Sequence, residues 1–338
     1  MTPAIPLVKA TFVMPFRVVM ENNGIDANQY FKKFHLPLNK LNDGETLVPE
    51  KPFWQLINQV AIAEMIPDFG MQVAQASPWH ENASLRPLLH GKQTLKAALE
   101  TFCVAASQQS NVSDFAITED SNLCWFENHG YILVSNDIQM ELYRVTNMIE
   151  LVQLATGKNW KPLKVQLMMD RNRVVEMNHI LKGCELVFSQ QRTAIAFPTG
   201  LLDATITTTP VSAQPEATDI NETYTFHKVQ DKNELIGALR EVIKLYITEE
   251  DLSIDTIAAI TGLSTRSLQR LMKKYAVSYN DLLNEARQHY ATEKLRNPAT
   301  KITDVACQLG YNDVAHFTRA FKRWSGMTPT QYRNQKVN

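Results

Sequence analysis

Two stretches near the C-terminal end of the chain repeat apolar residues with a helical period. One buried helix face is predicted by residues at i, i+3, i+4 and i+7, namely Phe317, Ala320, Phe321 and Trp324. The same spacing occurs 49 residues earlier in Leu268, Leu271, Met272 and Tyr275. The positions between these apolar residues are polar and often basic. The pattern therefore predicts two amphipathic helices that each carry cations on the outer face.

Each of these helices follows a shorter helical segment and a glycine. Residues 257–259 precede Gly262, and residues 305–307 precede Gly310. Small residues allow two helices to cross closely, and glycine permits a sharp turn between them. We therefore predict two helix-turn-helix units, at about residues 254–275 and 303–324.

Further helical patterns surround the two units. A longer helix opens at Ser278, continues through Leu295 and ends before Pro298, because proline cannot continue a helix. This single helix would fix the separation and orientation of the two units. Residues 227–246 predict a first helix for the same domain, and Thr328 and Pro329 predict the start of a last one.

The segment Gly310–Arg333, which reads GYNDVAHFTRAFKRWSGMTPTQYR, resembles the C-terminal signature of AraC/XylS transcription regulators. The resemblance implies an all-α domain that binds double-stranded DNA through two helix-turn-helix units. Upstream, the segments TLKAALETF, PLKVQL and GCELVFSQQRTAIAFPTGLLD resemble the arabinose-binding-type N-terminal domain of one branch of that family. Such domains bind a small effector, form dimers, or both.

The N-terminal part of the chain predicts an α+β sensory domain. Helical patterns cover residues 51–65, 94–107 and 136–155, with Thr94 as the N-cap of the second. Strands are predicted within residues 115–126, on either side of a turn at 119–122, and at 165–168, 186–188 and 194–197. A stretch rich in Thr, Ala and Pro then interrupts the apolar pattern. We expect an effector-binding or dimerisation domain at 1–205, a linker at 206–226 and the DNA-binding domain at 227–338.

Charge supports this division. The 338 residues have a net charge of −1, but the part from His227 onward carries 17 basic and 12 acidic residues, a net +5. The preceding part carries −6, which matches an acidic sensory half joined to a basic DNA-binding half. The four cysteines are scattered, as expected for reduced thiols in a cytoplasmic protein. No apolar run is long enough for a membrane span, and the sequence indicates no metal site, cofactor or catalytic motif.

The resemblance places the base-contacting residues on the early turns of the two recognition helices. Candidates in the first are Arg266, Gln269 and Arg270, and in the second Val314, Ala315, His316 and Arg319. Arginine suits guanine, glutamine suits adenine, and an alanine methyl can lie against a thymine methyl. Phosphate contacts are expected from Lys273, Lys274, Lys322 and Arg323. The contrasting interpretation is that Arg270 and Arg319 pair with nearby carboxylates, and that His316 lies on the helix flank.

The expected function is an activator that contacts RNA polymerase, forms a homodimer and responds to a small molecule. The sequence assigns no effector-binding residue. Aromatic residues in 12–34 and at Trp54, Trp79, Trp125 and Trp160 are candidates for a pocket wall, with core packing as the simpler role. Two other interpretations are an N-terminal domain that only dimerises, and a DNA-repair enzyme fused to the DNA-binding module. The enzyme would need an activated cysteine thiolate.

Overall fold

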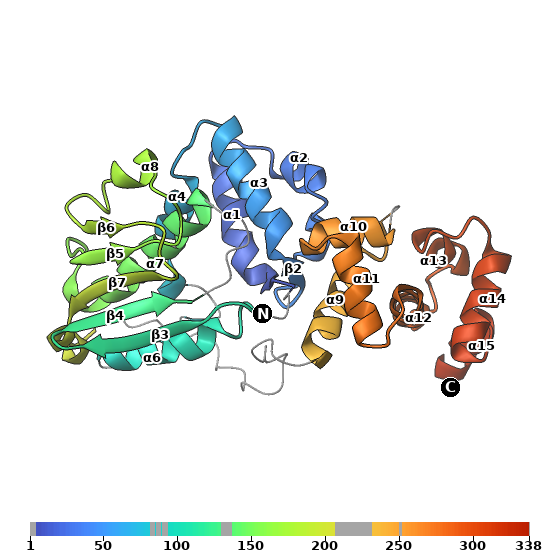
Figure 1. The fold of residues 1–338 in the computed structure, drawn as a ribbon. Helices are drawn as coiled ribbons and strands as arrows, with labels where there is room; N and C mark the ends of the chain where they lie inside the picture. The colour runs from blue at the N-terminus through green and yellow to red at the C-terminus, as the bar shows by residue number, and fades with distance from the viewer. Residues whose placement is uncertain are drawn as a thin grey trace. The chain divides into compact units, whose positions relative to one another are not determined.

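The computed structural model describes residues 5–81, 85, 89, 94–129, 137–206, 232–249 and 252–337. The chain divides into two compact units (Figure 1). The N-terminal unit consists of Pro6–Thr46 and Glu50–Val229, and the C-terminal unit of Met1–Ile5, Leu47–Pro49 and Gln230–Asn338. Apart from Ile206, the linker predicted at 206–226 lies outside the described residues.

A five-stranded sheet forms one side of the N-terminal unit. Its strands are β3 (Phe115–Asp120), β4 (Leu123–Asn128), β5 (Lys164–Gln166), β6 (Glu185–Val187) and β7 (Thr193–Pro198), in the order β3-β4-β7-β5-β6. β5 and β6 are parallel and the other neighbours are antiparallel. The turn between β3 and β4 places Ser121 at a φ of 55°. The predicted strands are thereby confirmed.

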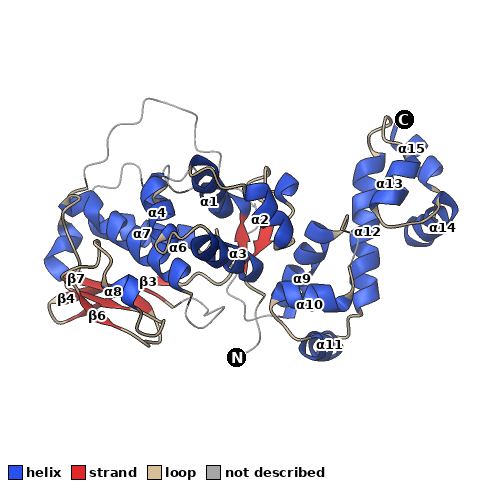
Figure 2. Cartoon of the chain, turned by 90° about the horizontal axis from the view of Figure 1, so that it is seen from above, coloured by secondary structure: helices blue, strands red, loops and turns tan. Residues whose placement is uncertain are grey.

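Helices cover the sheet and build the rest of the unit. They are α1 (Ala10–Asn22), α2 (Ala27–Lys33), α3 (Glu50–Ala63), α4 (Phe69–Ala76), α6 (Leu95–Ala106), α7 (Ile138–Thr156) and α8 (Arg173–Glu176). Short elements are β1 (Leu7–Lys9), η1 (Leu38–Lys40), η2 (Trp79–Glu81) and η3 (Thr199–Asp203). α6 contacts β3 and α7 contacts β7, and both lie on the same face of the sheet (Figure 2). The α+β class and the three predicted helices are confirmed.

Helix α7 is the central helix of this unit, because it contacts α3, α4, α6 and β7. Its first turn is capped by the carboxylate of Asp137, which accepts a hydrogen bond from the backbone N–H of Met140 at 3.0 Å. α4 approaches α7 at Gly70, whose backbone N–H donates to the side-chain oxygen of Gln139 at 2.8 Å. A Cβ atom at position 70 would lie 2.1 Å from the backbone oxygen of Gln139. Only glycine therefore allows this close crossing.

The C-terminal unit is all-α apart from β2 (Leu47–Pro49). Its helices are α9 (Lys232–Tyr246), α10 (Ile254–Thr261), α11 (Thr265–Lys274), α12 (Tyr279–Leu295), α13 (Ile302–Gln308), α14 (Val314–Ser325) and α15 (Pro329–Val337). Gly262 ends α10 with a φ of 78°, and Gly310 follows α13 with a φ of 75°. A left-handed backbone at these turns favours glycine, as the sequence indicated.

Helix α12 contacts both α9, which packs against α10, and the second helix-turn-helix unit. Towards its start, the Tyr279 hydroxyl donates to the backbone oxygen of Leu252 at 2.5 Å, and Glu285 pairs with Arg240 of α9. Further along, Gln288 donates to the backbone oxygen of Trp324 at 3.2 Å, and Tyr290 donates to Gln308 at 2.9 Å. Its buried residues are Leu282, Leu283, Ala286, Ala291 and Leu295. One continuous helix therefore connects α10 and α11 to α13 and α14 (Figure 2).

We expect Gly70→Ala to destabilise the protein, because the added methyl would collide with the backbone of α7. Overpacking of this kind costs about 1–3 kcal/mol. Gly200→Ala is the matched control, since a Cβ at position 200 has no other atom within 4 Å. Thermal unfolding of both variants measures the difference. Equal melting temperatures would show that α4 can move away from α7 without cost.

Candidate DNA-binding surface and effector cavity

Helix α11 presents a polar face to solvent and an apolar face to its unit. Leu268 is fully buried, and Leu271 and Met272 are also in the core. Arg266, Gln269, Arg270, Lys273 and Lys274 are all exposed. Ser264 caps the helix by accepting a hydrogen bond from the backbone N–H of Ser267 at 3.1 Å. The candidate residues of this helix therefore share one accessible surface.

Helix α14 has the same construction with a different composition. Phe317 and Phe321 are 0% exposed, whereas Ala315, His316, Arg319, Lys322 and Arg323 are exposed and Val314 is half-buried. Asp313 caps the helix by accepting from the backbone N–H of His316 at 2.7 Å, and this bond lowers the pKa of the Asp313 carboxyl. Trp324, expected in the core, is only half-buried. It lies in the last turn and packs edge-on against Tyr311.

The exposed cations of both helices are not used in internal ion pairs. Among the described residues, Arg266, Arg270 and Arg319 form no close ion pair with a carboxylate. The charge of Arg319 does help to lower the pKa of the Asp313 carboxyl, so the ion-pairing interpretation is excluded for Arg270 alone. Lys274 lies 5.4 Å from the ring centroid of Tyr275. The imidazole of His316 lies 3.6 Å from the carboxylate of Asp313. These guanidinium and ammonium groups are thus available to an external anion.

The N-terminal unit contains a cavity with an aromatic wall, with about 70 Å³ of open space. The apolar lining consists of Leu85 and of residues from β1, α1, α3, η2, α6, β3 and α7, namely Val8, Phe12, Trp54, Trp79, Phe102, Ala106, Phe115, Met140 and Tyr143. The polar lining residues are Glu50, Gln109, Ser110, Ser113 and Arg144. The indole N–H of Trp79 donates to the Tyr143 hydroxyl at 3.1 Å, and the Trp79 ring stacks on Phe102. A mostly apolar cavity with a few polar groups has the composition of a small-molecule site.

Glu50, the first residue of α3, is a carboxyl group in this cavity. It is 8% exposed, and the Ser110 hydroxyl donates to it at 2.6 Å. Burial raises the pKa of the Glu50 carboxyl, and the hydrogen bond from Ser110, the charge of Arg144 and a hydrogen bond from the Trp54 side chain partly oppose that shift. Glu50 is therefore a desolvated acid with its oxygens already hydrogen-bonded by the protein.

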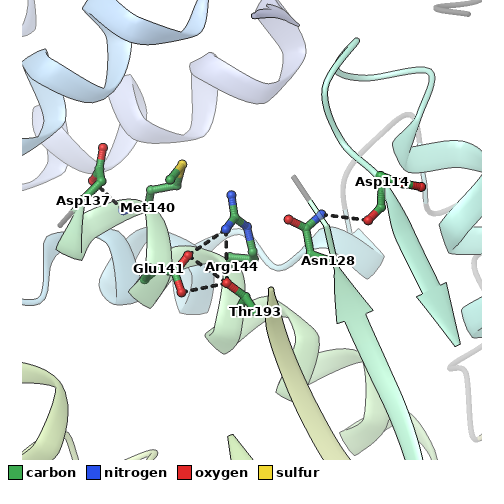
Figure 3. Close-up of polar contacts among 7 residues, drawn as sticks. All are labelled: Asp114, Asn128, Asp137, Met140, Glu141, Arg144 and Thr193. Carbon is green, nitrogen blue, oxygen red and sulfur yellow. Dashed lines mark hydrogen bonds and ion pairs between the residues drawn. The ribbon is translucent and has the colours of Figure 1, made fainter. Parts of the chain in front are cut away.

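Arg144 extends from α7 to the same cavity. Its Nη1 atom donates to Glu141 at 2.7 Å and to the Thr193 hydroxyl at 3.3 Å (Figure 3). Thr193 in turn donates to both carboxylate oxygens of Glu141. The Arg144 side chain is 12% exposed and that of Glu141 is 3% exposed. This network joins α7 to β7 and positions a cation at the cavity wall.

The comparisons with known proteins agree with both parts of the structure. Residues 257–335 match a helix-turn-helix domain model, and residues 24–206 match the arabinose-binding domain of AraC transcription regulators. The second match covers more than half of the chain.

The chain belongs to the AraC family of transcription regulators.

Relatives of this AraC-family protein differ in how much they share. The HTH-type transcriptional regulator VirS of Mycobacterium tuberculosis is 22% identical over 97% of this chain and 96% of its own length. An uncharacterised HTH-type regulator of the same species is 37% identical, but the match spans only 22% of each protein. Among solved structures, the Pseudomonas aeruginosa regulator CdpR aligns with 96% of this chain and 98% of its own, at 14% identity and a TM-score of 0.42.

The sequence suggested part of the cavity wall and missed its polar residues. Phe12, Trp54 and Trp79 line the cavity, whereas Trp125 and Trp160 are not among its lining residues. Glu50, Ser110 and Arg144 received no functional interpretation from the sequence. They are separated by tens of residues, and none belongs to a local motif.

Three of the four cysteines of the AraC-family protein, Cys103, Cys124 and Cys184, lack the features of a reactive thiol. Burial raises the pKa of Cys103 and of Cys124 to about 12, and it also raises the pKa of Cys184. A raised pKa disfavours the thiolate that a methyl-acceptor enzyme needs. In the described ranges, no three His, Cys, Asp or Glu side chains gather as metal ligands. None of the helices in those ranges has the length and apolar character of a membrane span.

Asp137 makes stability dependent on pH. Burial raises the pKa of its carboxyl from 3.8 to about 6, so the folded state holds a proton that the unfolded state releases. Stability should therefore fall as the pH rises from about 4 through about 6 and level off above, by on the order of 1–3 kcal/mol. Asp137→Asn keeps a capping side chain and should remove this loss. Denaturant unfolding of both proteins at pH 4.5 and pH 7.5 measures it. The expectation is wrong if the variant loses as much stability between pH 4.5 and pH 7.5 as the parent does.

Proposed function

We propose that this protein is a sequence-specific transcription regulator that places α11 and α14 in successive major grooves of one DNA duplex. The observation that carries the proposal is the pair of helix-turn-helix units built on α12, each with unpaired cations on its outer face. A helix of 17 residues is about 25 Å long, so α12 gives the two recognition helices a fixed separation. Double-stranded DNA offers major grooves once per helical turn, about 34 Å apart.

The two helices would read DNA unequally. α11 offers Arg266, Gln269 and Arg270, which can form bidentate hydrogen bonds with base edges. α14 offers Val314, Ala315, His316 and Arg319, a smaller and more apolar set. We assign most of the hydrogen-bonded discrimination to the half-site of α11. Lys273, Lys274, Lys322 and Arg323 would bind phosphates and fix the register of the protein on the duplex.

The N-terminal unit would regulate this activity by binding a small molecule. An aromatic cavity lined by a buried carboxyl and a half-buried guanidinium supports effector binding. We further propose that the protein forms a homodimer, works in the cytoplasm and activates transcription through contact with RNA polymerase, the commoner behaviour in its family. The shared family is the basis for these three points.

Changing Arg270 to Ala should reduce discrimination at one base pair by about 1–3 kcal/mol, because it removes a base contact. Changing Lys322 to Ala should weaken binding to all sequences and reduce the salt slope by about one, because it removes a phosphate contact. Arg296→Ala is the control, since this exposed arginine lies outside both recognition helices and pairs with Glu293. Binding to selected and random duplexes at several salt concentrations separates the effects. Equal losses on both duplexes for Arg270→Ala would refute its base-reading role.

Effector control makes a separate prediction. Some small molecule that raises the melting temperature of the full chain should also change its affinity for its selected DNA site, because the two binding events would be coupled. Phe102→Trp fills the cavity and should reduce the melting-temperature response while leaving DNA binding intact. If stabilising ligands never alter DNA binding, and sedimentation shows a dimer in their absence, the N-terminal unit serves dimerisation alone.

A further inference from the structure

We propose that the cavity binds an apolar carboxylate, with the acid group on Arg144 and an alkyl or single-ring body against the aromatic wall. This inference rests on the proposed effector role of the N-terminal unit and names the chemical class of that effector. It depends on three features of the cavity: the unused edge of one guanidinium, the state of the nearby acids and the shape of the apolar lining.

The guanidinium of Arg144 has one edge without a partner. Its hydrogen bonds within the described residues all involve Nη1, which donates to Glu141 and Thr193. Figure 3 shows the rest of the guanidinium turned away from these two side chains. The Nε and Nη2 atoms form the edge that can donate two parallel hydrogen bonds to a carboxylate. Arg144 lines the cavity, so a ligand there can reach this edge.

The groups around Arg144 favour an anion over a cation. Glu141 is already bound by Arg144 and by Thr193, and both oxygens of its carboxylate accept hydrogen bonds. Burial raises the pKa of Glu50 against the opposing charge of Arg144, which reduces the negative charge that would repel an anion in the cavity. A cationic ligand would instead meet Arg144 itself, and Glu50 is already hydrogen-bonded to Ser110. The unused donors of the cavity therefore select an anionic oxygen.

The remaining wall selects an apolar body of limited size. The polar groups of Trp79 and Tyr143 are hydrogen-bonded to each other, because the indole N–H donates to the phenol oxygen. Phe12, Phe102 and Phe115 add rings without polar atoms. The open space of about 70 Å³ would hold roughly five water molecules, the room of a short alkyl chain or one ring. Aromatic walls of this kind stabilise such a body by excluding water from it.

The test measures calorimetric binding of matched probes to the full chain. The acid probes are the straight-chain carboxylates from butyrate to decanoate, together with benzoate and phenylacetate. Each acid is compared with its amide and with the amine of the same carbon skeleton. We expect at least one carboxylate to bind about 10-fold or more tightly than its amide and its amine, since it alone uses the open edge of Arg144. Tighter binding of an amine, equal binding of acid and amide, or binding by no carboxylate at millimolar concentration would each overturn the proposal.

Two variants test the anchor itself. Arg144→Lys keeps a cation beside Glu141 but lacks the planar edge, and it should weaken carboxylate binding by about 10-fold with little effect on the amide. The double variant Arg144→Gln with Glu141→Gln removes both charges together, so neither is left buried and unpaired. It should abolish the preference for acid over amide. Arg17→Lys is the control, because Arg17 pairs with Glu21 on α1 and does not line the cavity. Unchanged acid preference in both Arg144 variants would refute the assignment.

The result also separates this inference from the proposed function. If neutral molecules or amines bind in the cavity and alter DNA affinity, effector control stands and the carboxylate class is wrong. If carboxylates bind through Arg144 and DNA affinity stays constant, the carboxylate class stands and effector control is wrong.

Discussion

The packing of α12 is the constraint on which the DNA-binding half depends. One helix contacts both halves of the C-terminal unit. Near its start Tyr279 and Glu285 bind Leu252 and α9, and further along Gln288 and Tyr290 bind α14 and α13. Isolated helices of this length are marginal in water, so the packing on both sides is what keeps α12 continuous. The recognition helices can be short because the helices packed against them fix their orientation, α10 for α11, and α12 and α13 for α14.

The two halves of the molecule build their sites in different ways. The DNA-binding surface consists of side chains that project from single helices into solvent, and its chemistry is positive charge without internal partners. The cavity is made from seven elements of the N-terminal unit, and its polar groups are held by a network of buried hydrogen bonds. A surface of the first kind suits a large polyanion, whereas a cavity of the second kind suits a small, largely desolvated molecule.

Local signals explain why the sequence predicted so much of the C-terminal unit. Periodic apolar residues, the caps Ser264 and Ser278, and the turn glycine Gly262 all act within a few residues of each other. Helix α1 was missed because Pro15 stands inside it, where proline normally argues against a helix. The cavity could not be predicted, because Glu50, Ser110 and Arg144 meet only through tertiary packing. Their residue types alone do not distinguish a binding site from a satisfied core.

The close crossing of α4 and α7 at Gly70 has a consequence for how a signal could leave the cavity. The close approach of the two backbones at Gly70 ties the start of α7 to α4 and opposes shear, the small sliding of one packed helix past another. Arg144 therefore lies on a helix that is held against α4. Any rearrangement that follows occupation of the cavity has to be taken up by the opposing elements, α1, α3 and α6, which carry Phe12, Trp54 and Phe102.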